Sequence, residues 1–187
     1  MAYQPKSYRK FLAGTVSAAL VASAIGPVAA SAAEETVVFP DLPSNEETAA
    51  AITALVEANV IKGINGEFKP YQDISRGQAA VMLARALGYD TASHEYKGTF
   101  SDLKEGTEVT AAVEYLAEQG YVSTNSKTYR PLDSTTRQEM ASLIVKAFEL
   151  KADGESKVTD LDKAWSVHRE NVEILSTLGI TTQTTFN

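Results

Sequence analysis

Apolar residues recur at helical spacing between Ile74 and Leu87, and the rest of the chain is organised around this stretch. Ser75 and Gln78 form the S-x-x-Q pattern of a capping box, which marks a helix start. Gly88 is the residue type that closes a helix. The apolar face follows the i, i+3, i+4, i+7 spacing of a helix and consists of Ala79, Ala80, Met82, Leu83, Ala86 and Leu87.

The same pattern recurs later in the chain. Thr136 and Glu139 form a second capping box, and an apolar face follows: Met140, Leu143, Ile144, Ala147 and Phe148. The residue after each cap is an arginine, Arg76 or Arg137, although the free amides of a first helical turn already carry about half a positive charge. The arginine is either a solvated surface residue or part of an anion site with those free amides. The recurrence favours the anion site.

A shorter apolar pattern precedes each of these helices. In the first unit, Ser44 and Glu47 form a capping pattern, and residues 49–58 predict a helix with an apolar side of Ile52, Leu55 and Val56. Residues 60–66 form a turn-rich loop. Each unit is therefore predicted to be a helix, a long loop and a second helix.

The unit repeats at a distance of 61 residues. The matched pairs are Phe39 and Phe100, Asp41 and Asp102, Leu42 and Leu103, Leu55 and Leu116, Phe68 and Tyr129, Pro70 and Pro131, and Arg76 and Arg137. A helix of such a unit cannot bury its apolar stripe alone, so neighbouring units must supply partners. The sequence predicts a mainly α fold in which tandem helix-loop-helix repeats pack around one common bundle.

A third copy opens at residues 159–161, and residues 165–178 match the first helix of the unit. This copy reaches Asn187 before its second helix, so we expect the chain to be a fragment of a longer protein and the bundle to lack one member. The predicted units are residues 38–90, 99–150 and 157–187, the last of them truncated.

The N-terminal residues 1–32 follow a different pattern. Lys6, Arg9 and Lys10 precede an apolar run over residues 11–28, and residues 30–32 are small. This order is typical of a secretory signal peptide, with cleavage after Ala32 or, as the alternative, after Ala30. Later stretches are too short or too polar to span a bilayer, so we expect no membrane partner for the mature form.

Charge and cysteine content limit the kinds of molecule and metal ion that this chain can bind. The chain has 17 basic and 24 acidic residues, and without residues 1–32 it keeps 14 basic residues and a net charge of −10. Such a chain repels nucleic acid, so any anion must be bound locally by a few placed cations. The chain contains no cysteine, so disulfides and thiolate metal sites are excluded; we expect no cofactor.

The repeated unit resembles the S-layer homology domain. The second signature, residues 135–139, is similar to the family's Ile-Thr-Arg-Ala-Glu, and residues 8–11 resemble Bacillus-type surface-layer precursors. The resemblance implies a pseudo-threefold helical bundle in a secreted protein of the cell wall, in the S-layer of a Gram-positive bacterium. The motifs that carry it are Phe39-x-Asp41-Leu42, Val60-Ile61-x-Gly63, Gly66-x-Phe68-x-Pro70 and Ile74-Ser75-Arg76.

The resemblance also implies a ligand and a site. The ligand is an acidic, pyruvylated secondary cell-wall polysaccharide, bound in grooves between repeats, which anchors the protein to the wall without a covalent bond. Thr124 stands where the first copy has Gly63, and Gly77 replaces the family's alanine at about 1 kcal/mol of helix propensity. Self-assembly through regions beyond residue 187 is left open. The implied polysaccharide-binding residues are Arg76, Arg137, Gly63, Gly66, Trp165, Asp41 and Asp102.

Several alternatives stay open at this point. The aspartates that open the units fit a calcium site or, with better odds, a turn or N-cap. Trp165 fits the core slightly better than a sugar-stacking platform. His94 in a linker and His168 on the outer part of a helix form no catalytic motif, and the acidic residues on the helices resemble solvated faces, so we expect neither a catalytic residue nor a metal site.

Three functions fit the sequence. The first is the wall anchor of a surface-layer protein. The second is the same anchor serving a cell-wall enzyme whose catalytic part lies beyond residue 187. The third is a helical repeat that binds a protein partner, which Arg76 and Arg137 disfavour.

Overall fold

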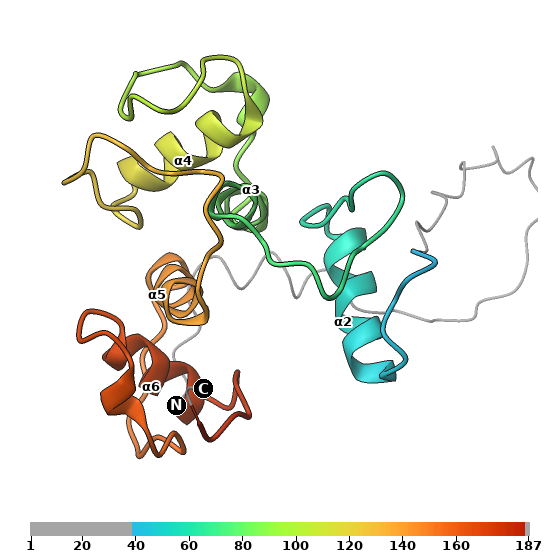
Figure 1. Ribbon diagram of the computed structural model, residues 1–187, viewed down its shortest axis with the longest axis vertical. Helices are drawn as coiled ribbons and strands as arrows, with labels where there is room; N and C mark the ends of the chain where they lie inside the picture. The colour runs from blue at the N-terminus through green and yellow to red at the C-terminus, as the bar shows by residue number, and fades with distance from the viewer. Residues whose placement is uncertain (1–38, 186–187) are drawn as a thin grey trace, which may run out of the picture.

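The computed structural model describes residues 39–185, and the predicted signal peptide lies outside them. Within the described residues the chain is mainly helical and forms no extended strand (Figure 1). Its elements in order are α2 (Glu46–Glu57), α3 (Arg76–Ala86), the 3₁₀ turn η2 (Thr91–Ser93), α4 (Glu108–Glu118), α5 (Arg137–Ala147), the 3₁₀ turn η3 (Leu161–Lys163) and α6 (Arg169–Thr177).

Both predicted capping boxes are present. Ser75 accepts a hydrogen bond from the amide of Gln78, whose side chain accepts one from the Ser75 amide, and Thr136 and Glu139 do the same at the start of α5. Gly88 follows the end of α3 with a φ of 74°, a left-handed conformation that glycine adopts without strain. Local sequence therefore determines where the two second helices begin and where α3 ends.

Two of the predicted helix starts are wrong. The N-cap of α2 is Asn45, which accepts from the amide of Thr48, and not Ser44. Asn and Ser cap equally well, so the choice depends on the loop that enters the helix. In the third copy the helix starts at Arg169 and not at Trp165. Here the Arg169 side chain donates to the carbonyl oxygens of Ala164 and Asp162 and holds the preceding residues in turns.

Each second helix packs against the first helix of the next copy. Helices α3 and α4 form one packed pair and α5 and α6 another, while α3 and α5 lie beside each other near the centre of the molecule (Figure 1). Helix α2 packs through its own loop against the far side of α3, where Ile52 is buried near Met82 and Ala86. The prediction that apolar stripes need partners from a neighbouring unit is confirmed for α3, α4, α5 and α6, whereas the stripe of α2 is buried within its own unit.

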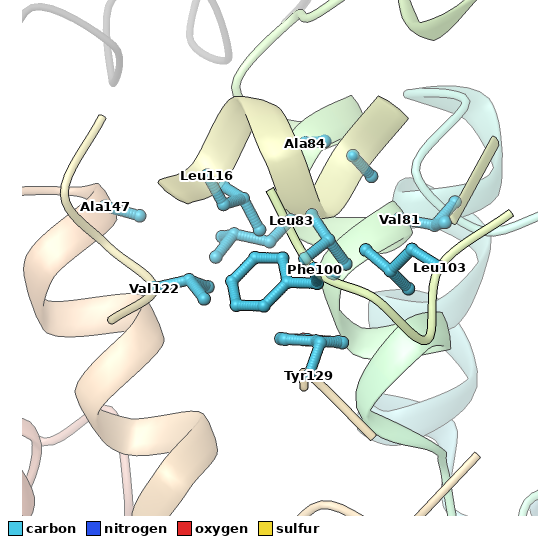
Figure 2. Close-up of a cluster of buried hydrophobic side chains, with 12 residues drawn as sticks. Val81, Leu83, Ala84, Phe100, Leu103, Leu116, Val122, Tyr129 and Ala147 are labelled. Carbon is cyan, nitrogen blue, oxygen red and sulfur yellow. The ribbon is translucent and has the colours of Figure 1, made fainter. Parts of the chain in front are cut away.

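Phe100 lies at the centre of the largest buried cluster, between α3 and α4 (Figure 2). Only 1% of its surface is exposed. The first copy has Phe39 at the matched position, also buried. The cluster consists of Ala80, Val81, Leu83, Ala84, Phe100, Leu103, Ala112, Val113, Leu116, Val122, Tyr129 and Ala147.

The third copy follows the second in its backbone hydrogen bonds. The amide of Tyr121 donates to the carbonyl of Leu116, and the amide of Ile180 donates to the carbonyl of Leu175 in the same way. Gly120 and Gly179 both have positive φ, 77° and 71°. These contacts align the third copy with the second at a distance of 59 residues around this helix end.

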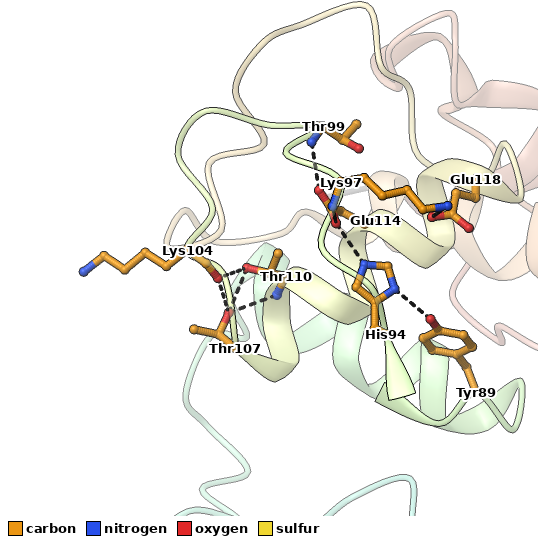
Figure 3. A network of polar contacts seen from close by, with 9 residues as sticks. All are labelled: Tyr89, His94, Lys97, Thr99, Lys104, Thr107, Thr110, Glu114 and Glu118. Atoms are coloured by element: carbon orange, nitrogen blue, oxygen red, sulfur yellow. Dashed lines mark hydrogen bonds and ion pairs between the residues drawn. The ribbon is translucent and has the colours of Figure 1, made fainter. Parts of the chain in front are cut away.

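A buried carboxylate holds the segment between α3 and α4 in place (Figure 3). Glu114 has no exposed surface, accepts from the amides of Lys97 (2.9 Å) and Thr99 (2.8 Å), and lies 2.8 Å from Nε2 of His94. The other ring nitrogen of His94 is 2.7 Å from the hydroxyl of Tyr89. The expectation that the acidic residues of the helices are solvated is therefore wrong for Glu114.

No helix among residues 39–185 is long and apolar enough to cross a membrane.

Candidate functional site: two grooves between repeats

Two grooves lie between successive copies, at matched positions of the repeat. The first groove has a volume of about 370 Å³ and is bounded by the loop of the first copy, α3 and the start of α4. The second groove has a volume of about 560 Å³ and is bounded by the loop of the second copy, α5 and the residue before α6. The matched lining positions, first groove before second, are Phe68 and Tyr129, Gln78 and Glu139, Val81 and Ser142, Met82 and Leu143, Arg85 and Lys146, and Val109 and His168.

Arg76 reaches from the first copy into the second groove. Its Nη1 lies 2.6 Å from a carboxylate oxygen of Glu139, and its Nε donates to the carbonyl of Tyr129 at 3.0 Å. The guanidinium carbon lies 4.9 Å from the centre of the Tyr129 ring, which adds a cation–π contact. The signature arginine therefore joins two copies and lines the groove, with 22% of its side chain exposed.

The amides at the start of α3 are not free, which corrects the expectation of an anion site built on them. The amide of Arg76 donates to the carbonyl of Asp133 (2.8 Å), and the amide of Gly77 donates to the carbonyl of Pro131 (2.9 Å). A Cβ on Gly77 would lie 3.0 Å from the Pro131 oxygen and 3.0 Å from Val109. The glycine at this position therefore has a packing reason, since the second copy's loop lies directly against the helix.

Arg137 lies apart from the second groove. It is exposed, donates a hydrogen bond to the side chain of Gln183, and lines a smaller cavity of about 90 Å³ beside α5 and α6. This cavity shares no lining residue with either groove. The structure thus places the two signature arginines in different cavities.

The two loop glycines have different surroundings. Gly63 has a φ of 69° and lines the first groove, where an added Cβ would lie 2.4 Å from the ring of Phe39. Gly66 has a φ of 80° at a tight turn, and an added Cβ would meet nothing within 4 Å. Gly63 and Arg76 line different grooves, so the structure does not bring these predicted site residues together.

The opening aspartates bind backbone amides across their own copies. Asp41 accepts from the amides of Phe68 (2.8 Å) and Lys69 (2.6 Å), and Asp102 accepts from those of Tyr129 and Arg130 at 2.8 and 2.7 Å. These contacts join residues 27 and 28 positions apart, so they are neither the local turn nor the N-cap that the sequence favoured. Each carboxylate instead ties the opening of its copy to the loop before the second helix. Their predicted contact with a polysaccharide stays a prediction.

Trp165 is not part of the core, since 59% of its surface is exposed. Its indole lies over the ring of His168, with centroids 6.0 Å apart, and its amide donates to the buried side chain of Gln138. His168 lines the second groove, and its Nδ1 lies 2.7 Å from the hydroxyl of Ser142. The exposed indole therefore borders the second groove through His168.

Protonation states in the second groove follow from its contacts. Burial alone would raise the pKa of Glu139, but the hydrogen bonds from Thr136 and the charge of Arg76 outweigh it and lower that pKa. Burial raises the pKa of Tyr129 to about 12, and burial lowers the pKa of His168. At neutral pH the groove therefore holds an ionised Glu139 and a neutral Tyr129.

The second groove is cationic overall, although the chain is acidic. Its lining contains Arg76, Arg130 and Lys146, against the single carboxylate of Glu139. The 61-residue repeat pointed to Arg76, but it gave no reason to single out Glu139, Lys146 or His168. The signal that was available for Lys146 is its match to Arg85, which is also basic.

Residues 39–185 contain no group of three or more histidine and acidic side chains arranged to hold a metal ion.

Residues 38–80 and 99–141 match the S-layer homology domain family. The chain therefore belongs to the S-layer homology domain proteins, as its motifs predicted, and its helical repeats agree with that assignment.

The similar proteins include surface-layer proteins and a protein named as an exoglucanase. "S-layer protein sap" of Bacillus anthracis is 33% identical over 184 residues, which is 95% of this chain and 22% of the relative. The "Surface-layer 125 kDa protein" of Lysinibacillus sphaericus is 38% identical over 157 residues, 83% of this chain and 13% of the relative. "Exoglucanase XynX" of Acetivibrio thermocellus is 28% identical over 118 residues, 63% of this chain and 11% of the relative. The chain thus spans less than a quarter of the length of these relatives.

Proposed function

We propose that this chain anchors a surface-layer protein to the bacterial cell wall by binding an acidic, pyruvylated secondary cell-wall polysaccharide. The protein is then exported and held at the cell surface. The second groove is the binding site in this proposal, with Arg76 as a ligand contact and Trp165 at its border. The observation that carries the proposal is a cationic polar groove in an acidic chain, lined by an arginine that the neighbouring copy supplies.

The chemistry of the groove suits a carboxylated sugar. A pyruvate ketal keeps a free carboxylate, and an arginine offers a planar fork of donors for such a group. Arg76 uses its Nε and Nη1 for hydrogen bonds within the protein, and its Nη2 donates none within the described residues. Exposed aromatic rings such as Trp165 present an apolar face on which the apolar side of a sugar can pack.

A polymer gains affinity from more than one groove. Once one sugar is bound, the next binds from a high effective concentration, so modest single-site affinities multiply. Such avidity allows an acidic protein to retain an acidic glycan although their net charges repel each other.

The test is binding of the purified full chain to wall sacculi, with variants that separate ligand contact from folding. Arg76→Gln removes the charge, and we expect at least a ten-fold loss of affinity, since a charge-assisted hydrogen bond contributes about 1.5–3 kcal/mol. Glu139→Gln removes the same ion pair but keeps a capping residue, as Gln78 shows in the first copy. We expect this variant to bind as well as the wild type or better.

Two outcomes would contradict the proposal. Equal loss of binding in the Gln variants of Arg76 and Glu139, with equal loss of thermal stability, would show that the ion pair acts only on folding. Undiminished binding to sacculi stripped of their non-peptidoglycan polymer would exclude the secondary polysaccharide and favour peptidoglycan or a protein partner.

A second candidate function is the same anchor serving a cell-wall enzyme. The similarity to a protein named an exoglucanase favours this alternative. Sequencing of the encoding gene distinguishes the two: a glycoside hydrolase domain encoded together with this chain would support the enzyme anchor, and a lattice-forming region would support the surface-layer protein.

A further inference from the structure

The two grooves differ in charge at one matched position. Arg85 lines the first groove and Lys146 lines the second, 61 residues later. Both residues lie in the last turn of a second helix and face the next copy. Their surroundings nevertheless leave one charge neutralised and the other not.

Arg85 is neutralised by the neighbouring copy. Its Nε lies 2.9 Å from one carboxylate oxygen of Glu108 and its Nη2 lies 2.8 Å from the other, a bidentate pair. Arg85 also donates to the carbonyl of Val60. A bidentate arginine–carboxylate pair is among the strongest of ion pairs, so the first groove keeps little of this positive charge for a ligand.

Lys146 lacks such a partner because the third copy differs at the matched position. The pairing of Val109 with His168 in the two grooves sets a distance of 59 residues, which places Val167 where the second copy has Glu108. Val167 is 73% exposed. Within residues 39–185, no carboxylate lies within ion-pair distance of the Lys146 ammonium group.

Lys146 lines the same groove as Arg76 but lies further along α5 than Glu139, the residue that pairs with Arg76. Glu139, Ser142 and Lys146 recur at helical spacing along one face of α5, and all line the second groove. Glu139, which holds Arg76, lies two turns before Lys146, or about 10 Å along the helix axis. The charge of Arg76 is compensated by Glu139, so the uncompensated cation of α5 in this groove is Lys146.

We infer that Lys146 acts together with Arg76 in receiving the carboxylate of the acidic ligand, and that the second groove therefore binds this anion more strongly than the first. The inference rests on the proposed function and extends it to a residue outside the signature motif. The loop of the first groove contributes Lys62 and Lys69, and Lys69 is paired with Glu67. Its helical wall is less polar at the matched positions, with Gln78, Val81, Met82 and the neutralised Arg85. The two copies thus provide non-equivalent sites for one polymer.

The test compares binding of the full chain and four variants to the same sacculi at low and high salt. Lys146→Gln removes the cation, and Lys151→Gln removes an exposed lysine outside the groove as a matched control. Val167→Glu restores the carboxylate that neutralises Arg85 in the first groove, and Val167→Gln is its neutral control. Thermal unfolding of each variant, followed by circular dichroism, reports on folding.

We expect about five-fold weaker binding for Lys146→Gln and Val167→Glu at low salt, and wild-type binding for the two controls. The difference should shrink at high salt, because exposed charges are screened. If the wild type binds and Lys146→Gln binds equally well, the role of Lys146 is overturned while the anchoring function stands. If Val167→Glu and Val167→Gln bind equally, the charge argument is overturned. If the wild type does not bind at all, the anchoring function itself fails.

Discussion

Glu114 offers a direct test of what holds the second copy together. Its carboxylate is fully buried and satisfies the amides of Lys97 and Thr99 as well as the ring of His94. In Glu114→Gln one carboxylate oxygen becomes an NH₂ group, which then faces a donor. One buried amide loses its partner, at about 1–3 kcal/mol, and the remaining hydrogen bonds lose their ionic character. We expect a total loss of about 3–5 kcal/mol in the free energy of unfolding, because three hydrogen bonds to one buried carboxylate are lost or weakened together.

Urea unfolding at neutral pH measures this loss. Glu118→Gln is the matched control, because Glu118 lies on the same helix and forms an exposed ion pair with Lys97 at 2.8 Å. An exposed pair contributes at most about 1 kcal/mol. A loss below about 1 kcal/mol for Glu114→Gln, no larger than that of the control, would refute the reasoning, since it would show that the buried carboxylate stabilises no more than a surface charge.

The pH dependence provides a second measurement on Glu114. Burial would raise the pKa of Glu114, but the hydrogen bonds from His94 and from the amides of Lys97 and Thr99 lower it below the ordinary value of 4.5. The unfolded state therefore binds a proton more readily than the folded state. The stabilisation is present above pH 4.5 and is lost as the pH falls through the lower folded pKa. The free energy of unfolding of Glu114→Gln should fall less steeply with acid than that of the wild type.

Two further predictions concern the loops. Gly63→Ala should lower the free energy of unfolding in urea by about 2–4 kcal/mol, because it combines a left-handed backbone with a clash against Phe39. Gly66→Ala has the same backbone conformation but open space around it, and should lower the free energy of unfolding by about 1 kcal/mol. Equal losses in the two variants would contradict the clash. Asp102→Asn should lower the urea midpoint at neutral pH. Burial raises the pKa of Asp102, but the hydrogen bonds from two backbone amides outweigh burial and bring this pKa below 3.8. The greater stability of the wild type should therefore disappear as the pH falls below 3.8. A stability difference that does not change with pH would contradict the role of these hydrogen bonds.

The sequence by itself determined the local structure and the family. The capping boxes at Ser75 and Thr136 lie at the start of α3 and α5, because a cap is a contact between residues three apart and can be read from spacing. The 61-residue repeat predicted that successive units need one another, and the match to the S-layer homology domain confirmed the family. The start of α2 was less accurate, since several polar residues before a helix can serve as its cap. The start of α6 was predicted too early, because the Arg169 side chain holds the preceding residues in turns.

Only the tertiary structure decided which charges are free. Arg76 and Arg137 look equivalent in sequence, yet Arg76 is paired with Glu139, which is 63 residues away, and lies in a groove that Arg137 does not reach. Glu114 resembles a surface residue in the helical pattern, yet the chain before α4 folds over it and satisfies its oxygens with backbone amides. Such pairings join distant residues through packing, and their energies depend on burial. Neither the partner nor the burial is encoded in the spacing of neighbouring residues.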